Sequence, residues 1–382
     1  MEILAQTTTQ QILFFILYGV TGAVSLVAAI YLMLRRGNAF APDVTPPLRL
    51  RRWAAAFFTV SALGHVWWFL FYSNLRDAQS MDEVVRKAGY VAIVVFDCVA
   101  MLTTIAGTLL SMLQDRRRRI WPVYVAMSPF VALGGVYLLK PSILLGQIAI
   151  TYILVLYVLF TVYMVFAIRH YRRWLKDNYA DLENKRVWLI AAVTLGCLLL
   201  FILYAMTDID SSFLIYLMHL TELVLFSLLL WRVETLPLLA EKKAAEQDVP
   251  QTSTPAPQPS SVIANTDLAQ IEQLLVEHCV ETQLYLQHDL SLQQLAQAIG
   301  TNRSYLSQYF SRQGITYNTY INNLRINHFI NLYQQTVKAG QPVVAQQLAS
   351  DSGYRSYSTF SLAFKQRTGQ SVTAWMRDDD DE

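Results

Sequence analysis

The sequence contains little cysteine and little charge. It has three cysteines in 382 residues (Cys98, Cys197 and Cys279), and their spacing fits neither a disulfide framework nor a zinc finger. Charged residues make up 15% of the chain, against about 25% in ordinary soluble domains, while hydrophobic residues make up 54%. These proportions exclude a secreted disulfide-stabilised protein and a single water-soluble globule. They are typical of a membrane protein that carries a soluble part.

The sequence also lacks the motifs of common hydrolases and nucleotide-binding enzymes. It contains no HExxH pattern, no serine in a nucleophile elbow and no phosphate-binding glycine loop. We therefore predict that the protein is not an enzyme and that it holds no resident cofactor or metal.

Seven apolar stretches are each long enough to cross a bilayer as a helix, which takes about 20 residues. The first is not a cleavable signal peptide, because residues 1–10 contain no Lys or Arg and the apolar run is too long. No stretch contains the lysine of a retinal Schiff base, which excludes a retinal photoreceptor. The expected spans are residues 11–34, 53–72, 89–113, 120–139, 144–168, 187–206 and 212–231.

Basic residues divide the connecting segments into two classes. The segments after the first, third, fifth and seventh stretches hold eighteen Lys and Arg residues, and the remaining segments before Thr266 hold four. Cytoplasmic loops of membrane proteins carry the excess of Lys and Arg, so we expect the N-terminus outside and the C-terminal part in the cytoplasm. The expected cytoplasmic ends also carry the amphipathic rings that prefer a membrane interface, Trp53, Trp121, Trp188 and Trp231.

The composition changes after the seventh stretch. Residues 233–248 are expected to form a short helix broken at Pro237, and residues 249–261 (VPQTSTPAPQPSS) a flexible tether with almost nothing to bury. From about Thr266 apolar residues recur at the helical period, which predicts a soluble helical domain. The acidic run at residues 378–382 is expected to be a solvated, disordered tail.

A pattern of helix, glycine turn and helix occurs twice in this domain. The first copy is residues 290–314 (LSLQQLAQAIGTNRSYLSQYFSRQG), in which Ser291 and Asn302 can cap the two helices and Leu306 and Phe310 form the buried stripe of the second helix. Such a helix-turn-helix can place its second helix in the major groove of DNA.

The second copy is residues 343–369 (VVAQQLASDSGYRSYSTFSLAFKQRTG). Gly353 supplies its turn, and Phe360 and Phe364 repeat the four-residue spacing of the first copy. An amphipathic helix over residues 317–335 separates the copies. Two such patterns in register are much more specific than one.

Residues from about Leu284 to Arg377 resemble the DNA-binding domain of the arabinose-regulator (AraC) family of bacterial transcription factors. The segments SLQQLAQAIGTNRSYLSQYF, INNLRINHFINLY and LASDSGYRSYSTFSLAFKQRTGQSVTAW carry the resemblance. It implies two helix-turn-helix units, joined by one long helix, that read successive major-groove segments of promoter DNA for RNA polymerase. The sequence departs from the family pattern at Val372, where a proline is usual.

The resemblance also implies which residues meet DNA. Gln308 is the strongest candidate for direct readout, because its amide can pair with N6 and N7 of adenine. A plain solvated helix face is the alternative for each polar residue. The family's base-reading positions correspond to Ser304, Ser307, Gln308, Tyr357, Ser358 and Leu362. Phosphate contacts, which set register rather than sequence, are expected from Arg303, Arg312, Arg355, Lys365 and Arg367.

The charge of this domain is modest for a DNA-binding protein. Residues 265–382 hold eight basic and eleven acidic residues, five of the latter in the terminal tail. We therefore expect DNA affinity to depend on a homodimer or on the concentration of the domain near the membrane.

Four ionisable residues fall inside the expected spans: His65, Asp97, His219 and Glu222. Such residues are costly in a bilayer and are usually paired or functional. At about 1.5 Å per residue, all four lie roughly 10–15 Å below the outer surface. Hydrogen bonds that hold the bundle together are the favoured interpretation. The alternatives are a site that senses a small ligand or a proton, and a metal site.

Together these features predict an all-α protein, a seven-transmembrane-helix bundle followed by a soluble double helix-turn-helix domain. The predicted function is a one-component transcription regulator in a bacterial inner membrane, with promoter DNA, RNA polymerase, membrane lipid, a second copy and an unknown small ligand as partners. The alternative is a membrane hydrolase or transporter whose helical tail binds a protein. The expected parts are a sensor (1–232), a juxtamembrane helix and linker (233–265), the DNA-binding domain (266–377) and the acidic tail (378–382).

Overall fold

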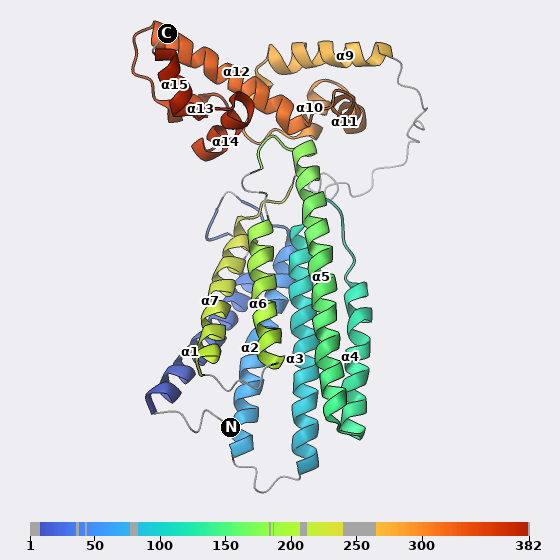
Figure 1. Cartoon of the computed structure of the whole chain (residues 1–382). Coiled ribbons are helices and arrows are strands. Elements are labelled where there is room, and N and C mark those ends of the chain that lie inside the picture. Colours follow the sequence, from blue (N-terminus) through green and yellow to red (C-terminus); the bar gives the residue numbers. More distant parts are fainter. Residues whose placement is uncertain are drawn as a thin grey trace. The chain divides into compact units, whose positions relative to one another are not determined.

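The computed structural model of the chain describes residues 8–35, 38–42, 44–76, 83–182, 185, 187–206, 212–239 and 265–380. These residues are mostly helical, and among them the structure holds no strand beyond an isolated β-bridge between Tyr179 and Ser291 (Figure 1). The expected all-α fold is therefore confirmed. The chain forms two compact units: unit 1 (Met1–Tyr171 and Val187–Leu238) and unit 2 (Arg172–Arg186 and Leu239–Glu382).

Unit 1 contains the apolar helices. Six helices are long and apolar enough to cross a membrane, whereas the described apolar part of α6, Trp188–Leu200, is shorter. Six spans are thus supported, and the expected count of seven is not confirmed. The helices are α1 (Thr8–Leu34), α2 (Leu48–Arg76), α3 (Glu83–Met112), α4 (Trp121–Leu139), α5 (Ile143–Asn178), α6 (Trp188–Met206) and α7 (Ser212–Thr235).

Unit 1 leaves large apolar side chains on its surface. Val158, Leu159 and Phe166 on α5 are all half-exposed or more, and similar residues line the outer faces of α1 and α4. In water this exposure would be unfavourable, but lipid tails are as apolar as these side chains. The surface therefore fits a bundle surrounded by lipid.

Unit 2 places two helix-turn-helix pairs, α10–α11 and α13–α14, against the long helix α12. One buried core surrounds α10 and α11, and another surrounds α13 and α14. The expected caps are present, because Ser291 accepts from the Gln294 amide and Asn302 from the Tyr305 amide. The elements are α9 (Asn265–Leu275), η4 (Val276–Val280), η5 (Leu284–Leu286), α10 (Leu292–Ala298), α11 (Arg303–Arg312), α12 (Tyr317–Lys338), α13 (Ala345–Asp351), α14 (Tyr357–Thr368) and α15 (Val372–Asp380).

Three expectations for the chain ends and the linker need comment. Helix α7 ends at Thr235, two residues before the expected break at Pro237, and residues 240–264, which include the rest of the expected helix and the expected tether, lie outside the described residues. The acidic run is not wholly irregular, because α15 continues through Asp380; the last two residues are not described. Although Val372 replaces the usual proline, α15 begins there, with Ser371 Oγ accepting from the Ala374 amide at 3.2 Å.

Gly353 lies where the second helix-turn-helix meets the segment before α10. Its φ is +86°, and a Cβ there would lie 2.7 Å from the carbonyl oxygen of Leu286. The Gly353 carbonyl also contacts Nδ1 of His288 at 3.1 Å. A side chain at position 353 would therefore be strained, and it would also push the second helix-turn-helix away from the segment around Leu286.

We predict that Gly353→Ala destabilises unit 2 more than Gly300→Ala. Gly300 also has positive φ (+71°), but nothing lies within 4 Å of its added Cβ. We expect about 1 kcal/mol for the backbone strain at Gly300, and about 2–3 kcal/mol at Gly353, where the clash adds to it. Hydrogen exchange of α13 and α14 in the full-length protein measures the difference. Equal losses for the two variants would show that the contact with Leu286 contributes no energy.

Candidate nucleic-acid interface and intramembrane site

The six predicted base-reading residues lie on the outer faces of α11 and α14. On α11, Leu306 and Phe310 are buried, whereas Ser304, Ser307 and Gln308 are exposed. On α14, Phe360 and Phe364 are buried in the core. The outward side chains of α14 are Tyr357, Ser358 and Leu362, all of them exposed.

A buried arginine on α12 joins the two helix-turn-helix units. Arg325 is 1% exposed and donates to the backbone carbonyls of Tyr285 (2.7 Å), Gln287 (2.7 Å) and His288 (3.3 Å). Its guanidinium lies 5.5 Å from the ring centre of Tyr354, next to the second turn. Burial lowers the pKa of Arg325 from its usual value.

Arg325 is not among the residues predicted from the sequence. A signal was present, because Arg325 lies four residues after Ile321 and four before Phe329, on the buried stripe of α12. A charged residue on such a stripe indicates a partner, since buried charges are seldom left uncompensated.

The five predicted phosphate-contacting residues differ in their surroundings. Arg312 and Lys365 are exposed, at the ends of α11 and α14. Arg355 forms an ion pair of 3.0 Å with Asp289, half-exposed on both sides. Two others are hydrogen-bonded to neighbouring segments: Arg367 to Asn323 and Asn327 of α12, and Arg303 to Asn178.

Arg303 is held by the segment that follows the apolar part of α5. The Asn178 side-chain oxygen accepts from Nε of Arg303 at 2.9 Å and from its Nη2 at 2.7 Å. Asn178 is the last residue of α5 and belongs to unit 2, as does Arg303, the first residue of α11. The contact therefore occupies the start of the first recognition helix.

The rest of this α5–α6 segment (Arg172–Arg186) is built into the first helix-turn-helix. Ala180 is 2% exposed within the core of α10 and α11, and its amide donates to the Leu290 carbonyl at 3.3 Å. Asn318 of α12 donates to the carbonyls of Tyr179 and Ala180 at 3.2 and 2.5 Å. Lys185 lies 3.4 Å from Asp289. No pattern in the sequence predicted this association.

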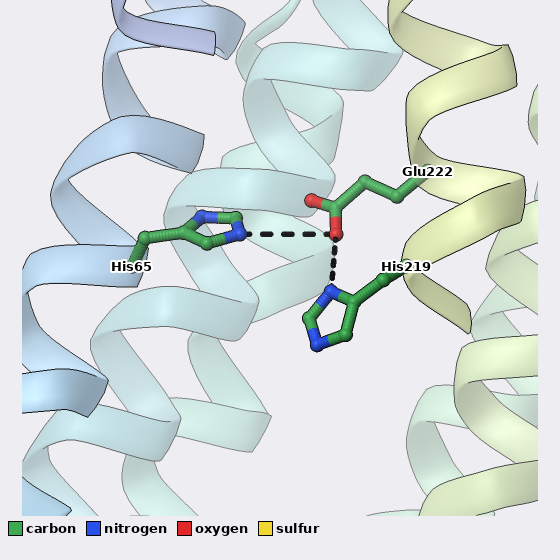
Figure 2. A group of neighbouring side chains, drawn as sticks. All are labelled: His65, His219 and Glu222. Carbon is green, nitrogen blue, oxygen red and sulfur yellow. Dashed lines mark ion pairs between the residues drawn. The ribbon is translucent and has the colours of Figure 1, made fainter. Parts of the chain in front are cut away.

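A second candidate site lies among the apolar helices of unit 1. Figure 2 shows His65 of α2 and His219 of α7 with both rings directed at the same oxygen of the Glu222 carboxylate. One Glu222 oxygen lies 3.5 Å from Nδ1 of His219 and 3.9 Å from Nε2 of His65. All three side chains are largely buried, at 9–14% exposure.

Helix α1 completes the surroundings of this polar cluster. Thr21 Oγ1 lies 2.9 Å from Nε2 of His65, and the Tyr18 hydroxyl donates to the His65 carbonyl at 2.5 Å. Asp97, the fourth predicted residue, instead accepts from the indole N–H of Trp68 at 3.3 Å. The structure thus brings three of the four predicted residues into one group.

Comparison with known protein families identifies the C-terminal part. Residues 295–378 match the family of the helix-turn-helix domain, of the AraC type. This is a family of DNA-binding regulators and not of enzymes. The chain matches no curated protein and no solved structure. An AraC-type DNA-binding domain therefore follows the six membrane-capable helices.

We predict that Gln308→Ala changes sequence preference, whereas Arg312→Ala weakens binding uniformly. Loss of a bidentate amide contact costs about 1–3 kcal/mol at one base pair, so discrimination there should fall about tenfold to hundredfold. Loss of a phosphate contact should lower the salt dependence of binding by about one counterion. Selection from random duplex DNA with the full-length protein measures both, with the exposed Gln273→Ala on α9 as the control. An unchanged preference in Gln308→Ala would remove this residue from the reading face.

Proposed function

We propose that the protein is a one-component transcription regulator of the bacterial inner membrane, in which a signal received by the membrane helices controls promoter binding by the two helix-turn-helix units. The observation that carries the proposal is the α5–α6 segment. This segment continues directly from a membrane-capable helix, yet it is packed into the first helix-turn-helix and bonds Arg303.

The charge distribution supports the same arrangement. The α5–α6 segment carries six of the basic residues that mark expected cytoplasmic loops, counting Arg169 just before it. A domain that binds chromosomal DNA must lie on that same side. This rule and the AraC-type domain support the proposed inner-membrane location, orientation and bacterial setting.

Arg303 provides a physical route from membrane to DNA. The N-terminus of a recognition helix is where phosphate groups approach, because backbone amides and the helix dipole favour anions there. While Arg303 bonds Asn178, its guanidinium donors are directed to an amide oxygen instead of a phosphate. Movement of α5 that withdraws Asn178 would release this cation and loosen the packing around Ala180. DNA affinity would rise with the population of the released state.

A second copy and RNA polymerase complete the proposal. The domain carries few basic residues, so one chain neutralises few phosphates. A homodimer in the membrane would present four recognition helices and would raise the local concentration of the second domain once the first is bound. RNA polymerase is the further partner we propose, because the AraC-type domain belongs to a family of transcription regulators.

We predict opposite effects for two substitutions of Asn178. Asn178→Ala removes the acceptor and should raise DNA affinity about tenfold to a hundredfold, because a hydrogen bond to a charged group is worth about 1.5–3 kcal/mol. Asn178→Asp gives Arg303 a carboxylate partner and should lower DNA affinity. Binding is measured by mobility shift with the full-length protein in lipid nanodiscs.

The opposite signs separate regulation from simple stability. If Asn178 only supports the fold, both substitutions would weaken binding together. That result would contradict the proposed control by the α5–α6 segment.

A further inference from the structure

We propose that His65, His219 and Glu222 form a binding site for a divalent transition-metal ion such as Zn²⁺, and that this ion is the signal of the regulator. The site stands on the geometry of the cluster alone. Its role as a signal rests on the proposed function.

The three side chains supply a recognised ligand set at nearly the required spacing. Two imidazoles and one carboxylate are a common set for Zn²⁺, which binds nitrogen and oxygen at about 2.0–2.2 Å in tetrahedral geometry. Ligand atoms around such an ion lie about 3.3 Å apart. The three candidate atoms already lie within 4.8 Å of one another, with Glu222 3.5 and 3.9 Å from the two histidines. Small side-chain movements would therefore close the site.

His65 has the hydrogen bond of a metal-ligating histidine. Its Nδ1 lies 2.8 Å from the backbone carbonyl oxygen of Ser61, which can only accept, so Nδ1 carries the proton. In the neutral ring this leaves a lone pair on Nε2, the atom that faces Glu222 (Figure 2). Metal-bound histidines are oriented by the same bond from their other nitrogen to a carbonyl.

Thr21 does not block this lone pair. Its hydroxyl lies 2.9 Å from Nε2 of His65, but it also reaches the carbonyls of Leu17 and Tyr18 at 3.0 and 2.9 Å. Rotation of the hydroxyl toward either carbonyl frees Nε2 without leaving the Thr21 proton unbonded.

His219 lacks a satisfactory partner. Among the described residues, its buried Nδ1 makes no hydrogen bond, and the nearest oxygen of Glu222 is 3.5 Å away. The cluster also contains a carboxylate in a medium that solvates charge poorly. A bound cation would give the unpartnered nitrogen a ligand bond and lie next to this carboxylate.

An ion at this position would join α7 to α2. Helix α7 is tied to α1 and α2 a second time near its C-terminal end, where Glu234 lies 3.9 Å from Arg51 and accepts from the Tyr31 hydroxyl at 2.9 Å. Binding at Glu222 would thus fix a second point on a helix that is already held near its C-terminal end. The ion would therefore restrict how α7 packs against α2, in addition to occupying its site.

The binding test uses the full-length protein in nanodiscs after treatment with a chelator. We expect one Co²⁺ ion per chain, with the visible absorption of a tetrahedral or five-coordinate site, displaced by Zn²⁺. His219→Ala and the nearly isosteric Glu222→Gln should each weaken binding at least a hundredfold. His170→Ala, which removes a histidine that is 63% exposed at the end of the α5 span, is the matched control.

Thr21→Val tests the site without altering any of the three proposed metal ligands. This variant should bind Co²⁺ with the same spectrum, because the Thr21 hydroxyl is proposed to turn away from Nε2 of His65 when the ion binds. Absence of Co²⁺ from the folded wild-type protein, or equal binding by Glu222→Gln, would overturn the metal site in favour of a hydrogen-bond network or a proton site.

The signal role is tested by promoter binding with and without Zn²⁺. A change of about tenfold that Glu222→Gln abolishes would support it, and stoichiometric metal binding with unchanged DNA affinity would overturn it. Failure of the metal hypothesis can be distinguished from failure of the proposed function. The Asn178 variants would still alter DNA binding if only the metal were wrong, whereas a full-length protein that binds no DNA would leave the metal site standing.

Discussion

The guanidinium of Arg325 fixes the geometry of the DNA-binding unit. It closes on three backbone carbonyls before α10 and on the ring of Tyr354 after α13, so it links both helix-turn-helix units to α12. A buried charge of this kind requires all of its partners at once, because any donor left unpaired would be costly. The placement of α11 relative to α14 depends on this side chain and on the close approach at Gly353.

The first helix-turn-helix depends on a further element from outside the family match. Ala180 lies in its core and Asn178 holds Arg303, although both precede the matched residues by more than a hundred positions. The segment that continues from α5 is therefore hydrogen-bonded to the first residue of α11. A flexible tether would transmit orientation poorly, whereas a segment packed in a core moves with that core or leaves it.

The cluster of His65, His219 and Glu222 also joins helices through polar contacts. His65 reaches α7, and Tyr18 and Thr21 reach α2, so one small group of polar atoms connects three helices. Apolar packing between helices in lipid is only weakly directional, so polar contacts specify how the helices fit together. A ligand that replaces these contacts can therefore alter the fit between α7 and its neighbours.

The sequence by itself determined what depends on local periodicity. Uninterrupted apolar runs identified the six membrane-capable helices, although the seventh expected span is not confirmed. The four-residue spacing of Leu306 and Phe310, repeated by Phe360 and Phe364, identified the inner and outer faces of α11 and α14. Helix caps such as Ser291 could also be predicted from the sequence, because a cap forms its hydrogen bond within the first turn of its own helix.

Tertiary structure decided the contacts between distant residues. The pairing of His65 with Glu222, the placement of Asp97 against Trp68, the partners of Arg325 and the insertion of Ala180 all join segments whose approach no local pattern encodes. Which residues face inward follows from helical geometry. Which residues meet there follows only from how the helices pack.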